Sequence, residues 1–351
     1  MMARDEIDIV ACNIAYHLEQ GVSHVIVTDN GSVDGTRDVL ADLARSAPVT
    51  VRDQEPTEWQ QGVWVSEMAR LAYEQFGADW VINTDADEFF VAPDSTLVEA
   101  VAAIPEPLDV VWVTRHDFVC VDRPRERTPP QEMLFRKRAS LHRHAGTWIP
   151  PKAIHRGAAD VVVTFGCHDA SSSSFRRREG IEHLVTFHYP VRSFEQFESK
   201  VRNAGSGFAR TKDLPLSTGS EHRTWYDQLL NGELADEFRD HHHFDPEELR
   251  RALASGEVVE DHRLAGKLPE SGTSSSTAPA RARFDPRTPS KTSVMPFRGS
   301  QADRALLELL DLLRQDRDAK AKALEAMQRS TSWRMTAPLR RGMDALRRRR
   351  D

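Results

Sequence analysis

Apolar residues alternate between helical and strand-like spacing along the first part of the chain. Helical spacing predicts helices over residues 8–19, 34–44 and 64–76. Short β-branched runs between these helices predict strands over residues 25–27, 49–52 and 80–83. This alternation is typical of an α/β fold with a mostly parallel, Rossmann-like sheet that is flanked by helices on both faces.

Beyond residue 96 the pattern is less regular. Single elements are predicted there from their spacing: a helix over 97–103, a strand over 110–114, and helices over 193–203 and 225–230. From about residue 267 to 299 the composition shifts to Ser, Thr, Pro and Gly, which is typical of a flexible linker. We therefore expect an α/β domain over 1–265, a flexible linker over 266–300, and a C-terminal helical tail over 301–351.

The expected tail has two parts. Apolar residues at helical spacing over 301–329 lie among many charges and predict an amphipathic or coiled-coil helix, which could pair copies of the chain into a homo-oligomer. Residues 330–351 combine arginines with apolar residues such as Trp333. Two interpretations of this basic segment stay open: a peripheral contact with an anionic inner membrane surface, or a solvated arginine-rich end.

Composition narrows the class of protein. The net charge of -7 argues against a general nucleic-acid binder. Cys12, Cys120 and Cys167 are widely spaced and form no CxxC pair, so neither a zinc site nor a disulfide framework is indicated. The opening MMARDEID is too charged for a signal peptide, and no apolar run reaches the roughly 20 residues that span a bilayer. We expect a cytoplasmic protein, peripheral on the inner membrane face if the tail binds there.

Two acidic clusters follow predicted strands. Asp85-Ala86-Asp87-Glu88 comes directly after the strand WVIN, and Asp29 opens the loop DNGSVDGT after the strand VIVT. In open parallel sheets, ligands gather where strands end, so both loops are expected to face one crevice. Carboxylates there could hold Mg²⁺ or Mn²⁺ against a diphosphate. The alternatives are a solvated acidic turn at Asp85 and, in the other loop, a turn in which Ser32 or Asp34 caps the next helix.

A family resemblance rests on these motifs together with later ones. The runs are RDEIDIV, AYHLEQGVSHVIVTDNGSVDGT, ADWVINTDADEFF, WIPPKAIHR, CHDA, FHYPVRSFEQFESKV and WYDQLLNGEL. This combination resembles bacterial family-two-type glycosyltransferases of the GT-A fold, and the related family that shares a D-x-D-E-F core. The resemblance extends from near the start of the chain to about Leu268.

The resemblance implies roles for individual residues. Asp29 is similar to the acidic residue that contacts the nucleoside of the donor. Asp85 and Asp87 are similar to the pair that serves ribose and metal, with Asp87 as the direct ligand of Mn²⁺ or Mg²⁺. A histidine often completes such a metal site, and both His188 in FHYP and His168 in CHDA are candidates; a structural histidine is the alternative for each.

Further roles are implied for the diphosphate and the acceptor. Lys152 and Arg192 are candidate contacts to either group, although solvated surface cations are the alternative. Inverting transfer requires a carboxylate that deprotonates the acceptor hydroxyl. Two carboxylates are candidate bases. Asp117 in TRHDF follows a predicted strand, and Asp169 lies beside His168.

The start of the chain departs from the family pattern. Members of the family begin with an apolar strand just before the segment that matches residues 2–6, and this strand is missing. We expect the start codon to lie upstream; a compromised protein is the alternative. A second local feature, the tract His241-His242-His243, resembles a metal site but lies in a charged stretch and is expected to be an exposed polar segment.

The sequence predicts a metal-dependent enzyme that moves a sugar from a nucleotide-diphosphate sugar to a hydroxyl on a cell-surface glycan or a lipid-linked glycan, with inversion implied by the resemblance alone. A metal-dependent nucleotidyltransferase is one alternative, although the chain shows no glycine-rich basic phosphate loop. A non-catalytic protein that binds sugar nucleotides or acts as a scaffold is the other.

Overall fold

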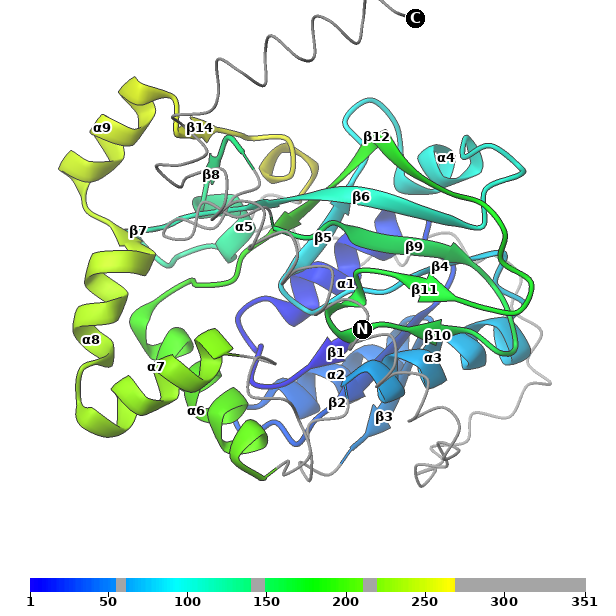
Figure 1. Ribbon diagram of the computed structural model, residues 1–351, viewed down its shortest axis with the longest axis horizontal. Helices are drawn as coiled ribbons and strands as arrows, with labels where there is room; N and C mark the ends of the chain where they lie inside the picture. Colours follow the sequence, from blue (N-terminus) through cyan, green and yellow to red (C-terminus); the bar gives the residue numbers. More distant parts are fainter. Residues whose placement is uncertain (55–60, 140–148, 211–219, 269–351) are drawn as a thin grey trace, which may run out of the picture. The chain divides into compact units, whose positions relative to one another are not determined.

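Two sheets meet edge to edge at a two-residue strand (Figure 1). The computed structural model describes residues 1–54, 61–139, 149–210 and 220–268. The predicted C-terminal helix and basic tail, and all of the predicted linker beyond residue 268, lie outside the described residues. Strand and helix bounds for the described part are as follows.

The first sheet is parallel and has the order β1-β2-β3: β1 is Met2–Ala3, β2 is Val25–Asp29 and β3 is Val49–Asp53. The second sheet has the order β4-β9-β6-β12-β5, with β4 at Trp80–Ile82, β9 at Lys152–Arg156, β6 at Val110–Asp117, β12 at Arg178–His188 and β5 at Glu88–Val91. Three small two-stranded sheets complete the set, namely β7 (Cys120–Val121) with β13 (His243–Phe244), β8 (Phe135–Lys137) with β14 (Val258–Glu260), and β10 (Val162–Val163) with β11 (Ala170–Ser171).

Strand β1 joins the two large sheets. Met2 pairs with Thr28 of β2 on one side and forms a parallel bridge to Asp85, beyond the end of β4, on the other. The amide of Met2 donates to the carbonyl of Thr84 at 3.2 Å, and the amide of Ala86 donates to the carbonyl of Met2 at 3.2 Å. Residues 2–3 therefore form a short strand between β2 and the residues that follow β4.

The helices are α1 (Val10–Glu19), α2 (Thr36–Ser46), α3 (Gln61–Phe76), α4 (Leu97–Ala102), α5 (Pro129–Glu132), α6 (Phe194–Arg210), α7 (Ser220–Asn231), α8 (Leu234–Glu237) and α9 (Pro246–Ser255). Most sit within a few residues of the predicted helices. None of the helices among the described residues is long and apolar enough to cross a membrane.

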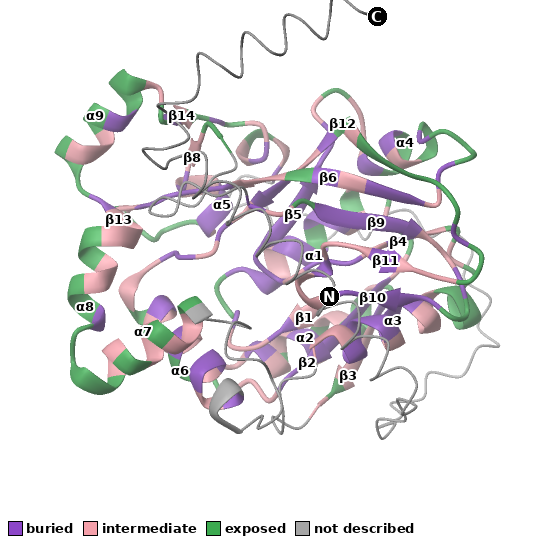
Figure 2. Ribbon diagram, in the orientation of Figure 1, coloured by how far each residue is buried: buried purple, intermediate pink, exposed green. Residues whose placement is uncertain are grey.

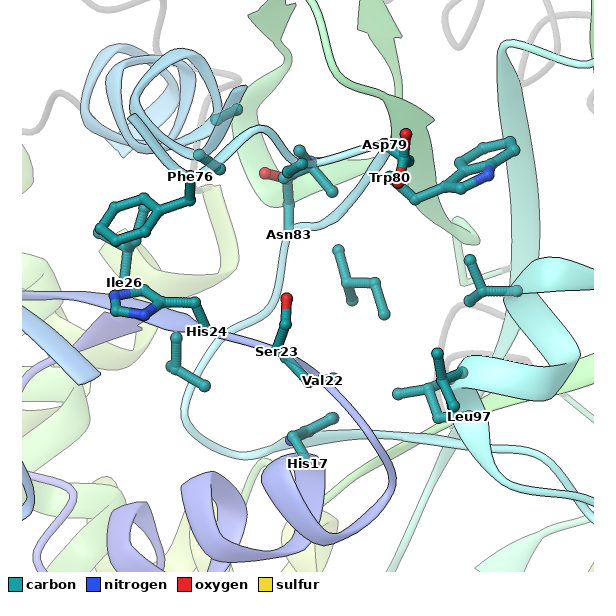
Figure 3. A pocket seen from close by; sticks show the side chains of 18 of the residues that line it. His17, Val22, Ser23, His24, Ile26, Phe76, Asp79, Trp80, Asn83 and Leu97 are labelled. Atoms are coloured by element: carbon teal, nitrogen blue, oxygen red, sulfur yellow. The ribbon is translucent and has the colours of Figure 1, made fainter. Parts of the chain in front are cut away.

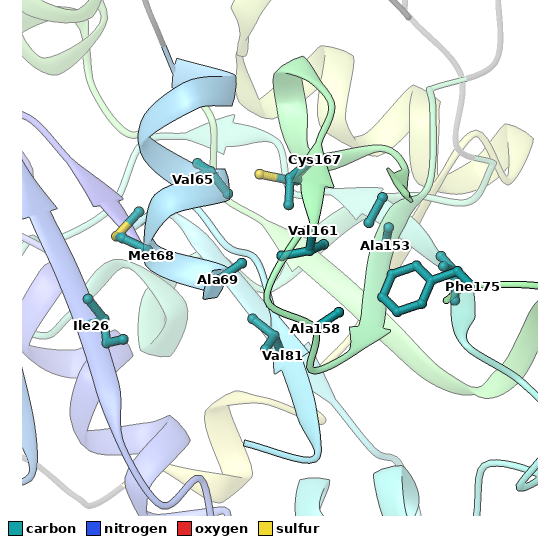
Figure 4. Packing of buried hydrophobic residues seen from close by; sticks show 13 residues of the cluster. Ile26, Val65, Met68, Ala69, Val81, Ala153, Ala158, Val161, Cys167 and Phe175 are labelled. Carbon is teal, nitrogen blue, oxygen red and sulfur yellow. The ribbon is translucent and has the colours of Figure 1, made fainter. Parts of the chain in front are cut away.

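Neighbouring residues of the central strands enter different apolar clusters, as expected for side chains that alternate between faces. Val81 and Ala153 pack with Val65, Met68 and Ala69 of α3 on one face (Figure 4). On the other face, Ile154 of β9 and Val111 of β6 pack with Leu97 of α4. The middle strands are therefore buried on both sides, whereas the outer surfaces of α7 and α9 are largely exposed (Figure 2).

The α/β fold is confirmed, with a mixed sheet in place of a mostly parallel one. In the five-stranded sheet, β12 runs parallel to β6, but the pairs β4–β9, β6–β9 and β12–β5 are antiparallel. Strands β9 and β12 were not predicted from the sequence. Residues 178–183 of β12 are mostly polar and mostly exposed, with Ile181 the one large apolar residue among them. That half of the strand therefore lacks an apolar run, and a register shift interrupts the pairing between Ile181 and Val185.

Buried His17 makes the folded state sensitive to acid. Its Nδ1 lies 2.9 Å from the carbonyl of Asn13, and its Nε2 lies 3.3 Å from the amide of Phe90, which donates to it. The ring is therefore held neutral, and burial lowers the pKa of His17 to about 4 from an ordinary value near 6.5. Below pH 6.5 the unfolded chain binds a proton that the folded chain does not bind, so stability should fall with falling pH.

We expect His17→Gln to reduce the loss of stability between pH 6.5 and 4 by about 3 kcal/mol, the linkage energy of a shift of this size. Urea unfolding at stepped pH measures this difference. His262→Gln, which changes an exposed ring on the surface, should keep the wild-type pH dependence. A His17→Gln protein with an unchanged slope would contradict the buried neutral ring.

Candidate active site

The turn between β4 and β5 carries Asp85, Asp87 and Glu88. Asn13 of α1 holds this turn through its side-chain amide, which donates to the carbonyls of Ala86 at 3.0 Å and of Glu88 at 2.7 Å. Met2 holds it from the β1 side. As a result the side chains of Asp87 and Glu88 are only 3% and 1% exposed, whereas that of Asp85 is 29% exposed. Two buried carboxylates therefore require cationic partners.

His188 lies between two of the predicted site carboxylates. The register of β12 places it beside Glu88 of β5 and beside Asp117 of β6. Its Nδ1 is 2.8 Å from Oδ1 of Asp117, and its Nε2 is 3.6 Å from Oδ2 of Asp87. Burial alone would lower the pKa of His188, but Asp87 and Asp117 outweigh it and raise this pKa.

The pKa of each carboxyl shifts in the matching direction. Burial would raise the pKa of Asp87, but Lys200, His188 and Arg192 hold it well below its ordinary value. For Asp117, Arg115 and His188 likewise outweigh burial and lower the pKa. Both acids are therefore carboxylates at neutral pH, and each faces one nitrogen of the same imidazole.

Two cations approach Asp87 from the segment after β12. The Nζ of Lys200 on α6 lies 2.6 Å from Oδ2 of Asp87. Arg192, whose side chain is fully buried, lies 3.9 Å from the same oxygen and pairs with Glu6 and with Asp8, the latter at 2.8 Å. Burial raises the pKa of Glu6 to about 7 even beside this guanidinium. Arg192 thus ties the loop after β1 to the wall of the site, and its predicted contact to a diphosphate stays a prediction.

Lys152 of β9 forms ion pairs with Glu88 and Asp85. Its Nζ lies 2.7 Å from Oε1 of Glu88, 3.3 Å from Oδ2 of Asp85 and 2.9 Å from the carbonyl of Gly166. Burial lowers the pKa of Lys152, but Glu88 and Asp85 outweigh it and raise the pKa, so the side chain is an ammonium. Gln61 adds a donor to Asp85 at 3.0 Å. Because Lys152 is 1% exposed, Asp85 is the member of this group that faces solvent.

The whole cluster is acidic. Within the described residues its six carboxylates are Asp85, Asp87, Glu88, Asp117, Glu6 and Asp8, and its cations are Lys152, Lys200, Arg192, Arg115 and, when protonated, His188. These six carboxyl groups outnumber the four lysines and arginines, but the raised pKa of Glu6 leaves that group only partly ionised at neutral pH. The excess of negative charge is therefore smaller than the count of acids, and the predicted divalent ion stays a prediction.

The second predicted loop lies on the far side of β1. Ala3 pairs with Asp29 while Met2 bridges to Asp85, so the two acidic strand ends flank β1 at about 10 Å from each other in the backbone. Asp29 is 3% exposed and accepts from the amide of Ser32 at 3.1 Å and from its hydroxyl at 2.5 Å. The strand order therefore places both acidic strand ends beside β1, and the predicted shared crevice stays a prediction.

His168 and Asp169 lie outside the group of residues around Asp87. They follow the 3₁₀ turn Phe165–Cys167, whose Gly166 carbonyl accepts from Lys152. Nδ1 of His168 is 2.8 Å from the carbonyl of Pro151. Asp169 pairs with Arg178 at 2.8 Å, and its side chain is 38% exposed. The structure therefore brings His188, and not His168, to Asp87.

Several members of the cluster were not predicted from the sequence. Lys200, Arg115, Glu6 and Asp8 all belong to quoted motifs, but nothing in their spacing assigns them a partner. The His241–His243 tract lies elsewhere: His241 and His242 approach Glu237, and His243 approaches Asp122 at 3.2 Å. In the described part of the chain, no group of three or more His, Cys, Asp or Glu side chains is arranged to hold a metal ion.

Comparison with known proteins agrees with these motifs. The model of the family described as "Glycosyl transferase family 2" matches residues 13–162. The matched segment carries Asp29, Asp85, Asp87, Asp117 and Lys152. It ends before His188, Arg192 and Lys200, whose roles therefore rest on geometry.

Similar solved structures include S. aureus TarS. The crystal structure of TarS 1-349 with UDP has 16% identity and a TM-score of 0.33, covering 68% of this chain and 70% of that one. The TarS 1-349 complex with UDP-GlcNAc has 14% identity and a TM-score of 0.34, covering 68% and 71%. A likeness at this level carries no argument about substrate or mechanism. No curated protein matches the chain.

The buried ion pair between Lys152 and Glu88 should contribute to the stability of the fold. Removing one partner of a buried ion pair leaves the other charge unpaired, so we expect Lys152→Met to lose about 3–5 kcal/mol of stability in urea unfolding. The double variant Lys152→Met with Glu88→Gln should recover part of that loss. Arg45→Met removes a surface pair with Asp42, both about 70% exposed, and should change stability by less than about 1 kcal/mol. Equal losses in the single and double variants would contradict the coupling.

Proposed function

We propose that this chain is a glycosyltransferase that moves a sugar from a nucleotide-diphosphate donor to a hydroxyl of a glycan or lipid-linked acceptor, with inversion. The observation that carries the proposal is the line Asp87–His188–Asp117 inside an acidic cluster, beside the partly exposed Asp85. The family match over residues 13–162 supports transfer of a glycosyl group. The acceptor class and the inversion rest on the motif resemblance.

The donor would lie across the carboxyl ends of β2 and β4. In this proposal Asp29 accepts from the nucleoside, because its strand end is the one that flanks β1 opposite Asp85. Its present partner Ser32 keeps the carboxylate oriented. Asp85 receives the ribose side of the donor, held in place by Lys152 and Gln61.

The residues around Asp87 fit a divalent cation. A histidine that ligates a metal usually donates its other ring nitrogen to a carboxylate, as His188 does to Asp117. Mg²⁺ and its relatives are commonly held by one or two protein groups together with substrate phosphates, so two ligands suffice. Asp87 and His188 would hold Mn²⁺ or Mg²⁺, which when bound supplies positive charge to the diphosphate leaving group.

Lys200 takes the place of that positive charge when no cation is present. Its ammonium contacts Asp87 directly, and its side chain is 32% exposed, so it has room to turn toward solvent. The proposal therefore gives Lys200 two partners: Asp87 without a donor, and an oxygen of the diphosphate with one. Arg192 is fully enclosed and serves to keep Asp87 in place.

Asp117 and Asp169 differ in how well each could act as the catalytic base. Asp117 already accepts from His188 and lies 3.3 Å from Arg115, and its lowered pKa makes it a weak base. This geometry favours an orienting role for Asp117. Asp169 is the remaining predicted base; it is partly exposed, although it pairs with Arg178.

Donor binding is tested by thermal unfolding of the full chain with UDP-, GDP- and dTDP-sugars, with and without Mn²⁺. One nucleotide at about 100 times its Kd should stabilise the protein by about 2.7 kcal/mol in the presence of Mn²⁺. Asp87→Asn should abolish this shift because it removes a carboxylate ligand. Asp236→Asn, which alters an acid about 70% exposed on α8, should keep it.

The same experiment separates the alternatives when products are analysed. Release of a nucleoside diphosphate with transfer of the sugar supports the glycosyltransferase. Pyrophosphate formed from a nucleoside triphosphate and a sugar phosphate would favour a nucleotidyltransferase. Binding without turnover in all assays would favour a non-catalytic sugar-nucleotide-binding protein.

A further inference from the structure

The carboxylate of Asp5 joins two segments that lie far apart in the chain. Oδ1 of Asp5, in the loop after β1, accepts from the amide of Val33 at 2.7 Å. Oδ2 accepts from the side-chain amide of Asn203 on α6 at 2.6 Å. Val33 belongs to the loop 29–36, which opens with Asp29. Asp5 therefore ties α6 to the loop that follows β2 (Figure 1).

The backbone around Asp5 takes part in the same arrangement. Its φ is 54°, in the left-handed region, which aspartate adopts more readily than most residues but still rarely. The amides of residues 5, 6 and 7 donate to the side chains of Ser32, Thr36 and Asp34, at 2.9 Å, 2.9 Å and 3.1 Å in that order. Backbone of this kind persists where surrounding contacts hold it, and here it joins two loops of the candidate site.

These hydrogen bonds also orient the carboxylate of Asp29. A backbone amide can only donate, so the hydroxyl of Ser32 accepts from Asp5 and keeps its one proton for Asp29. That hydroxyl donates to Oδ1 of Asp29 at 2.5 Å, and the amide of Ser32 donates to Oδ2 at 3.1 Å. The direction in which Asp29 faces therefore depends on Asp5.

The same carboxylate anchors the helix that carries Lys200. Lys200 and Asn203 are three residues apart, so they lie on one face of α6. The ammonium of Lys200 contacts Oδ2 of Asp87 at 2.6 Å, and the amide of Asn203 contacts Asp5. Asp5 is thus connected to one group at the nucleoside end of the proposed donor and to another at its diphosphate end.

We propose that Asp5 is a positioning residue of the donor site, which holds Asp29 and Lys200 at a fixed separation and so favours ligands that carry a nucleoside and a diphosphate on one molecule. This role rests on the proposed function, because the roles of Asp29 and Lys200 come from it. Asp5 acts through Ser32 and Asn203. A ligand that spans two preorganised contacts binds more tightly than its separate halves, and this gain depends on the spacing of the contacts.

The Asp5 contacts are separate from the cavity of about 510 Å³ shown in Figure 3. Among the described residues, those that line the cavity include Ile26, Phe76 and Trp80, but not Asp5 or Asn203. Substitutions at Asp5 and Asn203 therefore leave the lining of this cavity unchanged, and a loss of nucleotide binding in them has its cause at the two contacts.

The test measures binding to the full chain of UDP, GDP and dTDP, of the matching nucleosides, and of pyrophosphate, each with Mg²⁺. Calorimetric titration gives each Kd, with competition for the weak fragments. Glycine suits a φ of 54° and keeps the amide that donates to Ser32, so Asp5→Gly removes the carboxylate without straining the turn. Asn203→Ala removes the other partner.

Both variants should weaken binding of the preferred nucleoside diphosphate about tenfold, but change the Kd of its nucleoside and of pyrophosphate by less than about twofold. Arg202→Ala, which changes a neighbouring side chain of α6 that is 62% exposed, should leave all three Kd values unchanged. A purely structural role of Asp5 would weaken the nucleoside diphosphate and both fragments alike, and that result would overturn the proposal. Failure of the proposed function looks different, because wild type itself would bind no nucleotide, and that result overturns both.

Amide exchange of the unliganded full chain tests the two contacts without a ligand. Asn203→Ala should speed exchange over residues 29–36 about threefold or more, and Asp5→Gly should do the same over residues 198–206, because each removes one end of a shared contact. Arg202→Ala should have neither effect. Unchanged exchange in both variants would overturn the proposal, whatever the transfer assays show.

Discussion

Burial of charge at Asp87 and Glu88 is the constraint on which the rest of this structure depends. Neither carboxylate can lie at 3% and 1% exposure without cations close by, and those cations come from distant elements. Lys152 arrives on β9, His188 on β12 and Lys200 on α6. Each ion pair holds one of these elements against the β4–β5 turn. The packing of the strands and the balance of charge in the site therefore depend on each other.

The same constraint explains the loop after β1. Glu6 and Asp8 pair with Arg192, which is itself 3.9 Å from Asp87. Acid and base therefore alternate from the N-terminal loop through Arg192 to the metal-binding acid of the proposal. A cluster of this kind specifies geometry more than it adds stability, because an apolar core of the same volume can be as stable. Its value lies in holding oxygens and nitrogens where a charged substrate can meet them.

The local sequence pattern was sufficient to predict the strands that have short apolar runs, and the acidic residues that follow those strands. The strand at residues 25–27 and the DADE turn were predicted because β-branched residues and their polar ends are adjacent in the chain. β12 escaped because its first half is exposed and polar. Lys200 and Glu6 escaped for another reason: their partners lie 113 and 186 residues away, and no spacing rule reaches so far.

The register shift in β12 lies between two parts of the strand that have different neighbours. Residues 178–181 pair with β6 before the shift, and residues 185–188 pair with both β6 and β5 after it. Of the residues between, His183 contacts the carbonyl of Ala100 on α4 at 3.0 Å and Leu184 packs beside that helix. His188 is thus anchored independently of α4. Evolution could remodel the α4 side of the molecule, in length as well as in composition, without displacing the histidine that faces Asp87.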